Sequence, residues 1–240
     1  MTQVAIVVYP GMTALDAVGP YELLNLLEGR ELRFVSNEVG PIVTDSAALV
    51  LGATHTFAET PSPDVVLVPG SSHATAQRMA DTETTQWLRE VHPRTTFTTS
   101  VCSGALVLAA AGLLSGLSAT THWAGMPLLS TFGVTPRPDA RVVREGKIFT
   151  AAGVSAGIDL ALTLFAELEG DERAKRAQLM IEYDPRPPFD SGHMHKAAPE
   201  TRKSAKRAMA RASVTPREVG AIPKVLLTRF KQLLSRAPTP

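Results

Sequence analysis

The sequence of 240 residues contains a single cysteine, Cys102, which excludes an internal disulfide framework and a multi-cysteine metal site. Aromatic residues make up only 5% of the chain, so we expect a core built from Val, Leu, Ile and Ala. No apolar run approaches the length of a membrane span, and no basic segment followed by an apolar stretch opens the chain. The glycine fingerprints of dinucleotide and phosphate loops are also missing. These absences favour a cytoplasmic protein that needs no organic cofactor and binds no membrane.

What the sequence does contain is typical of one large α/β domain. Hydrophobic residues account for 44% and charged residues for 20%, which is ordinary for a globular protein of this length. Residues 3–9 and 64–69 are apolar runs without alternation, as expected for strands buried on both faces of a parallel sheet. Strands that alternate with helices along the chain predict a mostly parallel sheet covered by helices on both sides.

The remaining predicted elements follow from local patterns. They are a helix from about 16–20 to 28, a strand at 33–36, a small hairpin within 43–51, a helical stretch at 74–91, a strand-to-helix switch at 95–112, a strand at 119–123, a short helix at 125–131, a hairpin at 141–150 and a helix over 158–168. Residues 184–192 are rich in proline and predict an irregular loop.

The charge is distributed unevenly and suggests a division into residues 1–195, the α/β domain, and residues 196–240, a basic helical extension. The extension holds eleven Lys or Arg against two Glu, a formal +9, and the rest of the chain has 13 basic and 21 acidic residues, a formal −8. We expect its helices at about 200–212 and 218–235, broken by Pro216 and Pro223. A basic tail can bind nucleic acid, but we favour a solvated helix that packs on the acidic body or on a partner subunit.

Cys102 lies where a Thr- and Val-rich strand passes directly into an Ala- and Leu-rich helix. A side chain at such a turn projects from the carboxyl edge of the sheet, beside the free N–H groups of the new helix. Those N–H groups favour negative charge, so the thiol is expected to be biased toward thiolate. The competing interpretation is an inert buried cysteine. We interpret Cys102 as a nucleophile on an elbow.

Two more loops are expected at the same edge, because ligands of parallel sheets bind beyond the carboxyl ends of the strands. One carries Asp16, which either caps its own helix together with Thr13 or places an acid beside the thiol. The other carries Gly70 and Ser71, whose backbone N–H groups, like that of Ser103, could stabilise an anionic intermediate.

The histidines offer weaker candidates. His122 follows a predicted strand and is the candidate base for a Cys/His pair or for substrate binding, although a structural role is the more frequent one. His193 and His195 have the spacing of a metal-binding pair, but no supporting ligands accompany them in the sequence. We therefore expect no metal site.

An ordered set of landmarks between about residues 3 and 170 resembles the ThiJ/PfpI superfamily. These landmarks are Tyr9-Pro10-Gly11, Asp16-Ala17-Val18-Gly19-Pro20-Tyr21-Glu22, Val68-Pro69-Gly70, Val101-Cys102-Ser103-Gly104-Ala105, Ala119-Thr120-Thr121-His122-Trp123 and Gly153-Val154-Ser155-Ala156-Gly157-Ile158-Asp159. They are similar to the branch that holds the isocyanide hydratases and the sensor domains of AraC-type regulators. Residues 181–192 resemble the segment that follows the domain in isocyanide hydratases, which favours the enzyme.

The resemblance implies a flavodoxin-like three-layer sandwich that forms a homodimer, with Cys102 as nucleophile and with Asp16 and Ser103 beside it. It implies that water is added to an isocyanide to give an N-substituted formamide, through a thioimidate on the cysteine and with no metal or organic cofactor. Two features depart from the family pattern. Ser71 stands where a second glycine is usual, and the basic tail is longer than the fold requires.

Three alternatives stay open at this level. A cysteine-based stress sensor or ligand-binding module would need the same reactive thiol. A DNA-associated regulator is disfavoured because about 45 residues are too few for paired helix-turn-helix units. Proteolysis is ranked lower because no histidine base is placed with certainty beside Cys102.

Overall fold

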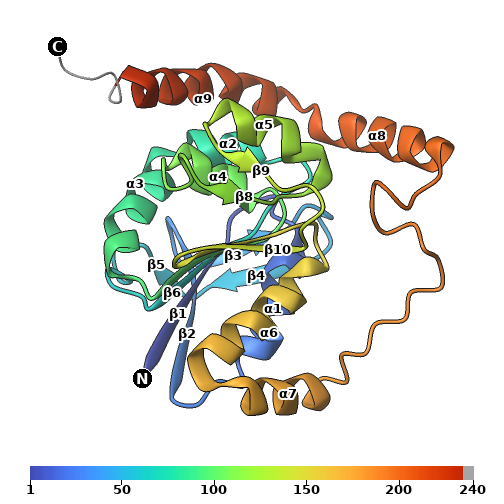
Figure 1. Cartoon of the computed structure of the whole chain (residues 1–240). Coiled ribbons are helices and arrows are strands. Elements are labelled where there is room, and N and C mark those ends of the chain that lie inside the picture. The colour runs from blue at the N-terminus through green and yellow to red at the C-terminus, as the bar shows by residue number, and fades with distance from the viewer. Residues whose placement is uncertain (235–240) are drawn as a thin grey trace.

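The computed structural model describes residues 1–234 and has a seven-stranded sheet at its centre (Figure 1). The strand order is β10-β11-β7-β6-β1-β2-β5, and every neighbouring pair is parallel except the β10–β11 hairpin. The strands are β1 (Thr2–Val7), β2 (Arg30–Ser36), β5 (His55–Thr56), β6 (Val65–Val68), β7 (Phe97–Ser100), β10 (Val142–Glu145) and β11 (Ile148–Ala151). The predicted mostly parallel α/β sheet is confirmed.

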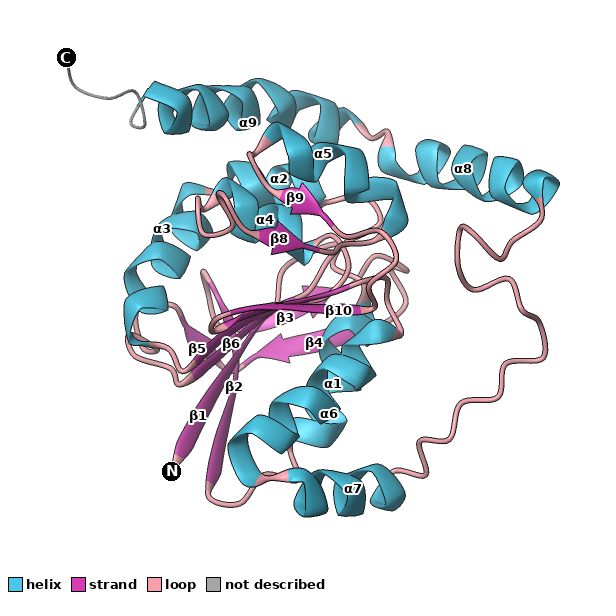
Figure 2. Cartoon of the chain, viewed as in Figure 1, coloured by secondary structure: helices cyan, strands magenta, loops and turns pink. Residues whose placement is uncertain are grey.

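Helices cover both faces of the sheet and complete three layers (Figure 2). One face carries α1 (Ala14–Leu24), α6 (Ala156–Glu169) and α7 (Asp171–Met180). The other carries α2 (Thr75–Ala80), α3 (Thr82–Val91), α4 (Gly104–Ala110) and α5 (Met126–Thr131), with the 3-10 turns η1 (His92–Arg94) and η2 (Trp123–Gly125). Beyond them lie α8 (Pro199–Ser213) and α9 (Pro216–Leu234). No helix among residues 1–234 is both long enough and apolar enough to cross a membrane.

Two small sheets sit outside the central one. The antiparallel pair β3 (Gly40–Val43) and β4 (Val50–Ala53) confirms the hairpin predicted within 43–51. The strand expected at 119–123 is only the two-residue β8 (Ser118–Ala119), which pairs in parallel with β9 (Thr135–Pro136). The predicted hairpin at 141–150 forms as β10 and β11, with Gly146 at positive φ in the turn.

The core is aliphatic, as the composition predicts. All four residues of β6 and the last four of β1 are fully or almost fully buried. A fully buried Val, Leu or Ile contributes about 1.5–3 kcal/mol relative to exposure, so these central strands fix the position of the loops at their carboxyl ends.

Two predicted helices differ in their bounds. Helix α1 starts at Ala14, earlier than expected, and includes Pro20, because the proline ring packs against α6 where Gly157 leaves room. This start puts Asp16 inside the first turn of α1. The single helix expected at 74–91 is two helices, since Asp81 accepts a hydrogen bond from the Thr84 N–H (3.1 Å) and starts α3.

The helices of the C-terminal part also differ from those predicted. Pro216 begins α9, but Pro223 lies inside that helix and does not break it. Helix α7 was not expected from the sequence and begins after Gly170, whose φ is +87°. Residue 235, the last of the predicted helix, and residue 236, one of the eleven basic residues counted in the extension, lie outside the described residues.

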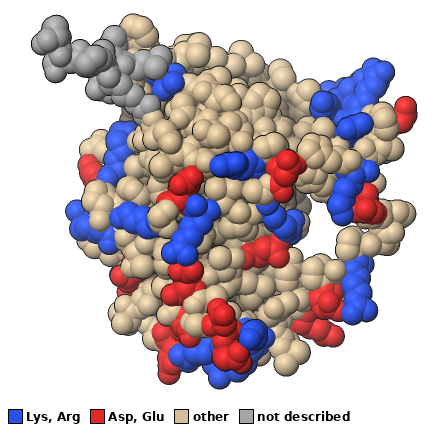
Figure 3. Space-filling model, in the orientation of Figure 1, with Lys and Arg blue, Asp and Glu red and all other residues tan. Residues whose placement is uncertain are grey.

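The arm between α7 and α8, residues 181–198, is the irregular segment that its prolines predict. It stands away from the body, and Lys and Arg side chains gather on the projecting α8 (Figure 3). Helix α8 has no buried residue, whereas α9 packs on α2.

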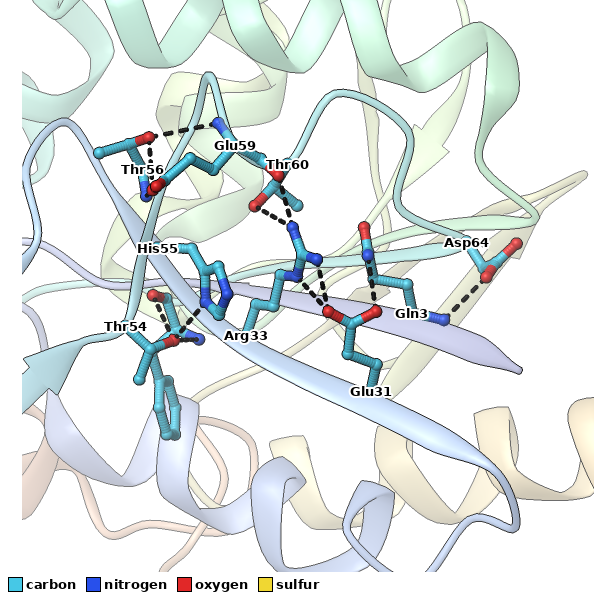
Figure 4. A network of polar contacts seen from close by, with 10 residues as sticks. Gln3, Glu31, Arg33, Thr54, His55, Thr56, Glu59, Thr60 and Asp64 are labelled. Carbon is cyan, nitrogen blue, oxygen red and sulfur yellow. Dashed lines mark hydrogen bonds and ion pairs between the residues drawn. The ribbon is translucent and has the colours of Figure 1, made fainter.

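At the opposite end of the sheet from this extension, β1 and β2 carry a network of partly buried polar contacts (Figure 4). Arg33 Nε donates to Glu31 Oε1 (2.7 Å), and Gln3 Nε2 donates to Glu31 Oε2 (2.9 Å). The backbone N–H of Gln3 donates to Asp64 (2.8 Å). These side chains fasten neighbouring strands together and lie far from the only cysteine.

Candidate active site

Cys102 occupies a tight strand-to-helix turn between β7 and α4. Its φ is +58°, a left-handed backbone conformation that is strained for a residue other than glycine. The Cys102 N–H donates to Ala152 O (2.8 Å), and the hydroxyl of Thr121 donates to Cys102 O (2.7 Å). Both peptide groups of the residue are therefore fixed by distant parts of the chain. The predicted elbow is present.

The turn also requires a close approach between two parts of the backbone. A Cβ on Gly104 would lie 2.1 Å from Val68 O, and a Cβ on Gly70 would lie 2.4 Å from Ser103 N. Only glycine fits at these two positions. The loop after β6 and the start of α4 are thus pressed together around Cys102.

Asp16 reaches this turn from α1 and does not cap its own helix. Thr13 is the N-cap residue, and its hydroxyl donates to Asp45 Oδ2 (2.7 Å) rather than to the helix. The Gly70 N–H donates to Asp16 Oδ2 (2.8 Å), and Oδ1 is buried with no partner of regular hydrogen-bond geometry. The interpretation that places an acid beside the thiol is the one consistent with this geometry.

Burial strongly raises the pKa of the Asp16 carboxyl. Its side chain is fully buried, and this desolvation raises its pKa from an ordinary 3.8 to about 7. The Gly70 N–H and the Cys102 side chain lower the pKa in part, and the Asp45 carboxylate raises it. Near neutral pH Asp16 can therefore both accept and donate a proton, which is what a general acid and base requires.

The pKa of the Cys102 thiol is raised, whereas the sequence suggested that it would be lowered. Cys102 is only 6% exposed, and burial raises the pKa of its thiol well above the usual value. The neighbouring Asp16 carboxylate raises it further, and the backbone N–H and hydroxyl of Ser103 act against both effects. Burial and the neighbouring carboxyl group therefore act against the thiolate that the helix terminus was expected to favour.

Ser103 and Ser71 link the elbow to the loop after β6. The Ser71 N–H donates to Ser103 Oγ (2.9 Å), and Ser103 Oγ also lies 2.8 Å from Thr75 Oγ1. The hydroxyl of Ser71 donates to Gly11 O (2.5 Å) and accepts from the Ala74 N–H (2.8 Å). The serine that departs from the family pattern therefore stabilises the turn before α2.

These contacts bear on the predicted anion-binding groups. The N–H of Gly70 is already bonded to Asp16, and the N–H of Ser71 to Ser103. An anionic intermediate would have to compete with these side chains for the two donors. Their role in binding it stays a prediction.

His122 lines the same cavity. Its Nδ1 accepts a hydrogen bond from the Ala124 N–H (3.3 Å), which assigns the ring proton of the neutral form to Nε2. Burial lowers its pKa, so the neutral form is favoured. A neutral imidazole with Nε2–H can donate a hydrogen bond into the cavity.

The cavity beside Cys102 has a volume of about 350 Å³. Its lining includes the polar side chains of Ser71, Ser103 and His122 and the apolar side chains of Leu106 and Leu128. A larger open hollow of about 610 Å³ beside α8 is lined by basic side chains and contains neither the cysteine nor a carboxylate. Of these two hollows, the one at Cys102 brings together a thiol, hydroxyl groups and an imidazole.

Among the residues of this cavity that sequence reasoning missed are Asp45, Met209, Ser213 and Glu218. Asp45 sits in the turn between β3 and β4 and offers no local signal. Glu218 is one of only two acids in a segment of formal charge +9, and this isolation was the available clue.

His193 and His195 lie on the arm, close to Asp139, so the pair has one more possible ligand than the sequence suggested. His195 Nδ1 contacts Asp139 (2.8 Å). Both ring nitrogens of His193 are engaged, Nε2 with Pro138 O (3.2 Å) and Nδ1 with the His195 N–H (3.2 Å). Asp139 and His195 are exposed and His193 is half-buried.

Comparisons with known proteins agree with this architecture. The model of the DJ-1/PfpI family matches residues 2–167. The isonitrile hydratase of Pseudomonas putida is 44% identical over 214 residues, which are 89% of this chain and 90% of that protein. The crystal structure of a THiJ/PfpI family protein from Pseudomonas syringae is 38% identical and superposes with a TM-score of 0.86, covering 93% of this chain and 90% of that one.

A regulator is also similar over part of its length. The HTH-type transcriptional regulator GlxA of Rhizobium meliloti (strain 1021) is 33% identical over 170 residues, which are 69% of this chain but only 52% of the regulator. The chain thus spans about half of that protein and nearly all of the hydratase. On the matched family model and on these relatives, the chain belongs to the DJ-1/PfpI family.

Proposed function

We propose that the protein is an isocyanide hydratase, which converts R–N≡C and water into an N-substituted formamide. The observation that carries the proposal is the buried pair of Cys102 and Asp16, whose carboxyl has a pKa of about 7. The similarity to the isonitrile hydratase of Pseudomonas putida over 89% of the chain supports the same reaction.

In the first step the Cys102 sulfur attacks the terminal carbon of the isocyanide. The Asp16 carboxylate takes the thiol proton as the C–S bond forms and delivers it to the same carbon. The product is the thioimidate R–N=CH–S–Cys102, and Asp16 is again a carboxylate. A residue with a pKa near the working pH suits this double role.

In the second step water attacks the thioimidate carbon, and Asp16 relays a proton from that water to the nitrogen. The tetrahedral intermediate R–NH–CH(OH)–S–Cys102 then breaks its C–S bond. The hydroxyl proton returns to the sulfur, and R–NH–CHO leaves. No electrons are gained or lost, so the residues of the chain suffice.

The neighbouring groups would hold the reactants. The N–H and hydroxyl of Ser103 lower the thiol pKa and would stabilise the sulfur as it gains charge. The Nε2–H of His122 is suited to donate to the substrate nitrogen, which becomes more basic in the thioimidate. Gly70 and Ser71 keep Asp16 and Ser103 in place through their N–H groups.

We also propose that the protein is a homodimer in the cytoplasm. Large apolar side chains on α7 and the arm, Leu179, Met180 and Phe189, are strongly exposed, and a partner subunit would cover them. A single free cysteine suits a compartment that keeps thiols reduced. Size-exclusion chromatography with light scattering should give twice the mass of the chain, and a monomer at micromolar concentration would exclude the dimer.

The reaction is tested by mixing the protein with cyclohexyl isocyanide and following N-cyclohexylformamide by NMR. Wild type should form the formamide, and Cys102→Ala should not. Absence of product with the wild type, or undiminished turnover by Cys102→Ala, would overturn the assignment.

A thiol sensor is the competing function, and the site argues against it. Sensor cysteines are accessible and have a low pKa, whereas Cys102 is buried and its pKa is raised. Intact-mass analysis during peroxide titration should therefore show little oxidation at low oxidant. Stoichiometric oxidation at low peroxide without isocyanide turnover would favour the sensor.

A further inference from the structure

The C-terminal extension is joined to the active-site loop by a buried carboxylate. Glu218, in the first turn of α9, is only 9% exposed. Its two carboxylate oxygens accept the backbone N–H groups of Ala76 (2.8 Å) and Gln77 (3.0 Å). These N–H groups belong to the first turn of α2, whose N-cap residue Ala74 has no side chain that could cap them. An acid 142 residues away along the chain therefore supplies the missing cap.

Other contacts attach the extension to the domain on either side of Glu218. The hydroxyl of Ser213 donates to Ser72 O (3.1 Å), in the loop that leads into α2. Near the end of α9, Gln232 Nε2 donates to Ala110 O (2.7 Å), at the carboxyl end of α4. The extension thus touches both helices that begin at the active site.

This attachment brings part of the extension to the cavity that contains Cys102. Met209, Ser213 and Glu218 line the cavity of about 350 Å³ that also contains Cys102 and Ser103. We call residues 209–218 the closing segment. The earlier part of α8 projects from the body and buries no residue, so the contact with the cavity is confined to this segment.

We propose that the closing segment is a wall of the substrate pocket, fixed by Glu218, and that Met209 limits the size of the group that can reach Cys102. The apolar lining residues, among them Leu106, Leu128 and Met209, would take a compact apolar substituent, with the isocyanide carbon directed to the thiol. The substrate class rests on the proposed function. The wall itself does not, because it governs access to the sulfur for any reagent.

The first test uses the fact that Cys102 is the only cysteine. Alkylation by iodoacetamide, a small reagent, and by N-(1-pyrenyl)maleimide, a bulky one, is followed by intact mass. Glu218→Ala removes the capping carboxylate, and Met209→Ala removes the side chain that narrows the pocket. Each variant should raise the rate of Cys102 alkylation by the bulky reagent by roughly tenfold. Both variants should change the iodoacetamide rate less than about threefold. Met209→Trp should slow the bulky reagent.

The matched control is Glu200→Ala, which removes the other acid of the extension, an exposed residue at the start of α8. It should change neither rate. If Glu218→Ala raised the alkylation rates of both reagents equally, the whole site would have become more accessible, and the proposal that the closing segment is a pocket wall would be contradicted. Unchanged rates with the bulky reagent in both Met209 variants would overturn the role of Met209 even if Glu218→Ala unfolds.

The second test is specificity toward isocyanides. Met209→Ala should raise kcat/KM for 1-adamantyl isocyanide relative to isopropyl isocyanide by roughly tenfold or more, as expected when a pocket wall loses several heavy atoms. If no isocyanide is hydrated but the alkylation rates change as predicted, the proposed function fails and the wall stands. If isocyanides are hydrated but reagent size has no effect in any variant, the wall fails and the function stands.

Discussion

Two carboxyl groups at opposite ends of the sheet show how the same chemical group acquires different properties. Asp16 is fully buried, and its pKa is raised to about 7 by desolvation. Glu31 is partly exposed near the start of β2, where hydrogen bonds from Gln3 and then from Arg33 lower its pKa. Charge at Glu31 is matched by a cation, whereas charge at Asp16 is accommodated only by a backbone N–H and a thiol. The first group is suited to carry a proton during a reaction, and the second to remain ionised and join strands.

The largest expected difference is in activity. Asp16→Asn keeps the shape and an acceptor for the Gly70 N–H but cannot relay a proton, so we expect kcat/KM to fall by about 10²–10⁴-fold. Glu31→Gln should stay within about twofold of wild type, because it changes only a surface ion pair. Steady-state assays with one isocyanide compare the two. Comparable losses in both variants would contradict the assignment of the proton relay to Asp16.

The same two substitutions should move stability in opposite directions at alkaline pH. Because the folded state raises the pKa of Asp16, ionising it costs stability, and the cost grows as the pH rises from the unfolded value of 3.8 through about 7. Asp16→Asn should therefore stabilise the protein at pH 8 by roughly 1–4 kcal/mol, with the gain vanishing toward pH 4. Glu31→Gln should cost at most about 1 kcal/mol. Urea unfolding at several pH values measures both, and a destabilised Asp16→Asn at pH 8 would refute the raised pKa.

Crowding is a second respect in which the two regions differ. A Cβ on Gly70 would lie 2.4 Å from Ser103 N, whereas a Cβ on Gly52, in the exposed β3–β4 hairpin, would meet nothing within 4 Å. We expect Gly70→Ala to cost about 1–3 kcal/mol and to lower turnover. Gly52→Ala should stay within about 0.5 kcal/mol of wild type. Thermal unfolding of the pair checks this, and a fully stable and active Gly70→Ala would show that the loop and the elbow can separate freely.

The smallest expected effect concerns the neighbour of Asp16. Activity should rise with pH around a midpoint near 7, since the carboxylate form must accept the thiol proton. The Asp45 carboxylate raises the pKa of Asp16, so Asp45→Asn should lower this midpoint by less than about one pH unit. Profiles of kcat/KM against pH would detect it. A midpoint that moves upward would mean that Asp45 affects the site in another way.

The sequence predicted the parts of the fold that depend on local patterns. The apolar runs of β1 and β6 and the switch at Cys102 are each encoded within a few residues, so the sheet and the elbow could be inferred. The start of α1 was placed too late, because Gly157 leaves room for the Pro20 ring inside the helix. Pro223 was expected to break the C-terminal helix, but α9 continues through it. Helix α7 was missed because its residues are mostly polar and carry little apolar periodicity.

The candidate site could be predicted only in part. Cys102, Asp16 and the Gly70 loop were brought together by the rule that parallel strands direct their carboxyl ends to one edge. The direction of the Cys102 pKa shift could not be inferred, because it depends on burial and on the neighbouring carboxyl rather than on the helix terminus. The contact of Glu218 with α2 joins residues 142 apart, and nothing in the local sequence specifies it.

The central claim is that Cys102 and Asp16 act as a pair that shares one proton at neutral pH. The direct measurement is the rate of Cys102 alkylation by iodoacetamide as a function of pH, in wild type and in Asp16→Asn, without any isocyanide. Wild type should show a rise centred near pH 7, a plateau, and a second rise at higher pH when the thiol ionises independently. Asp16→Asn should lose the step near 7 and keep a single rise set by the thiol. Identical profiles in the two proteins would contradict the account.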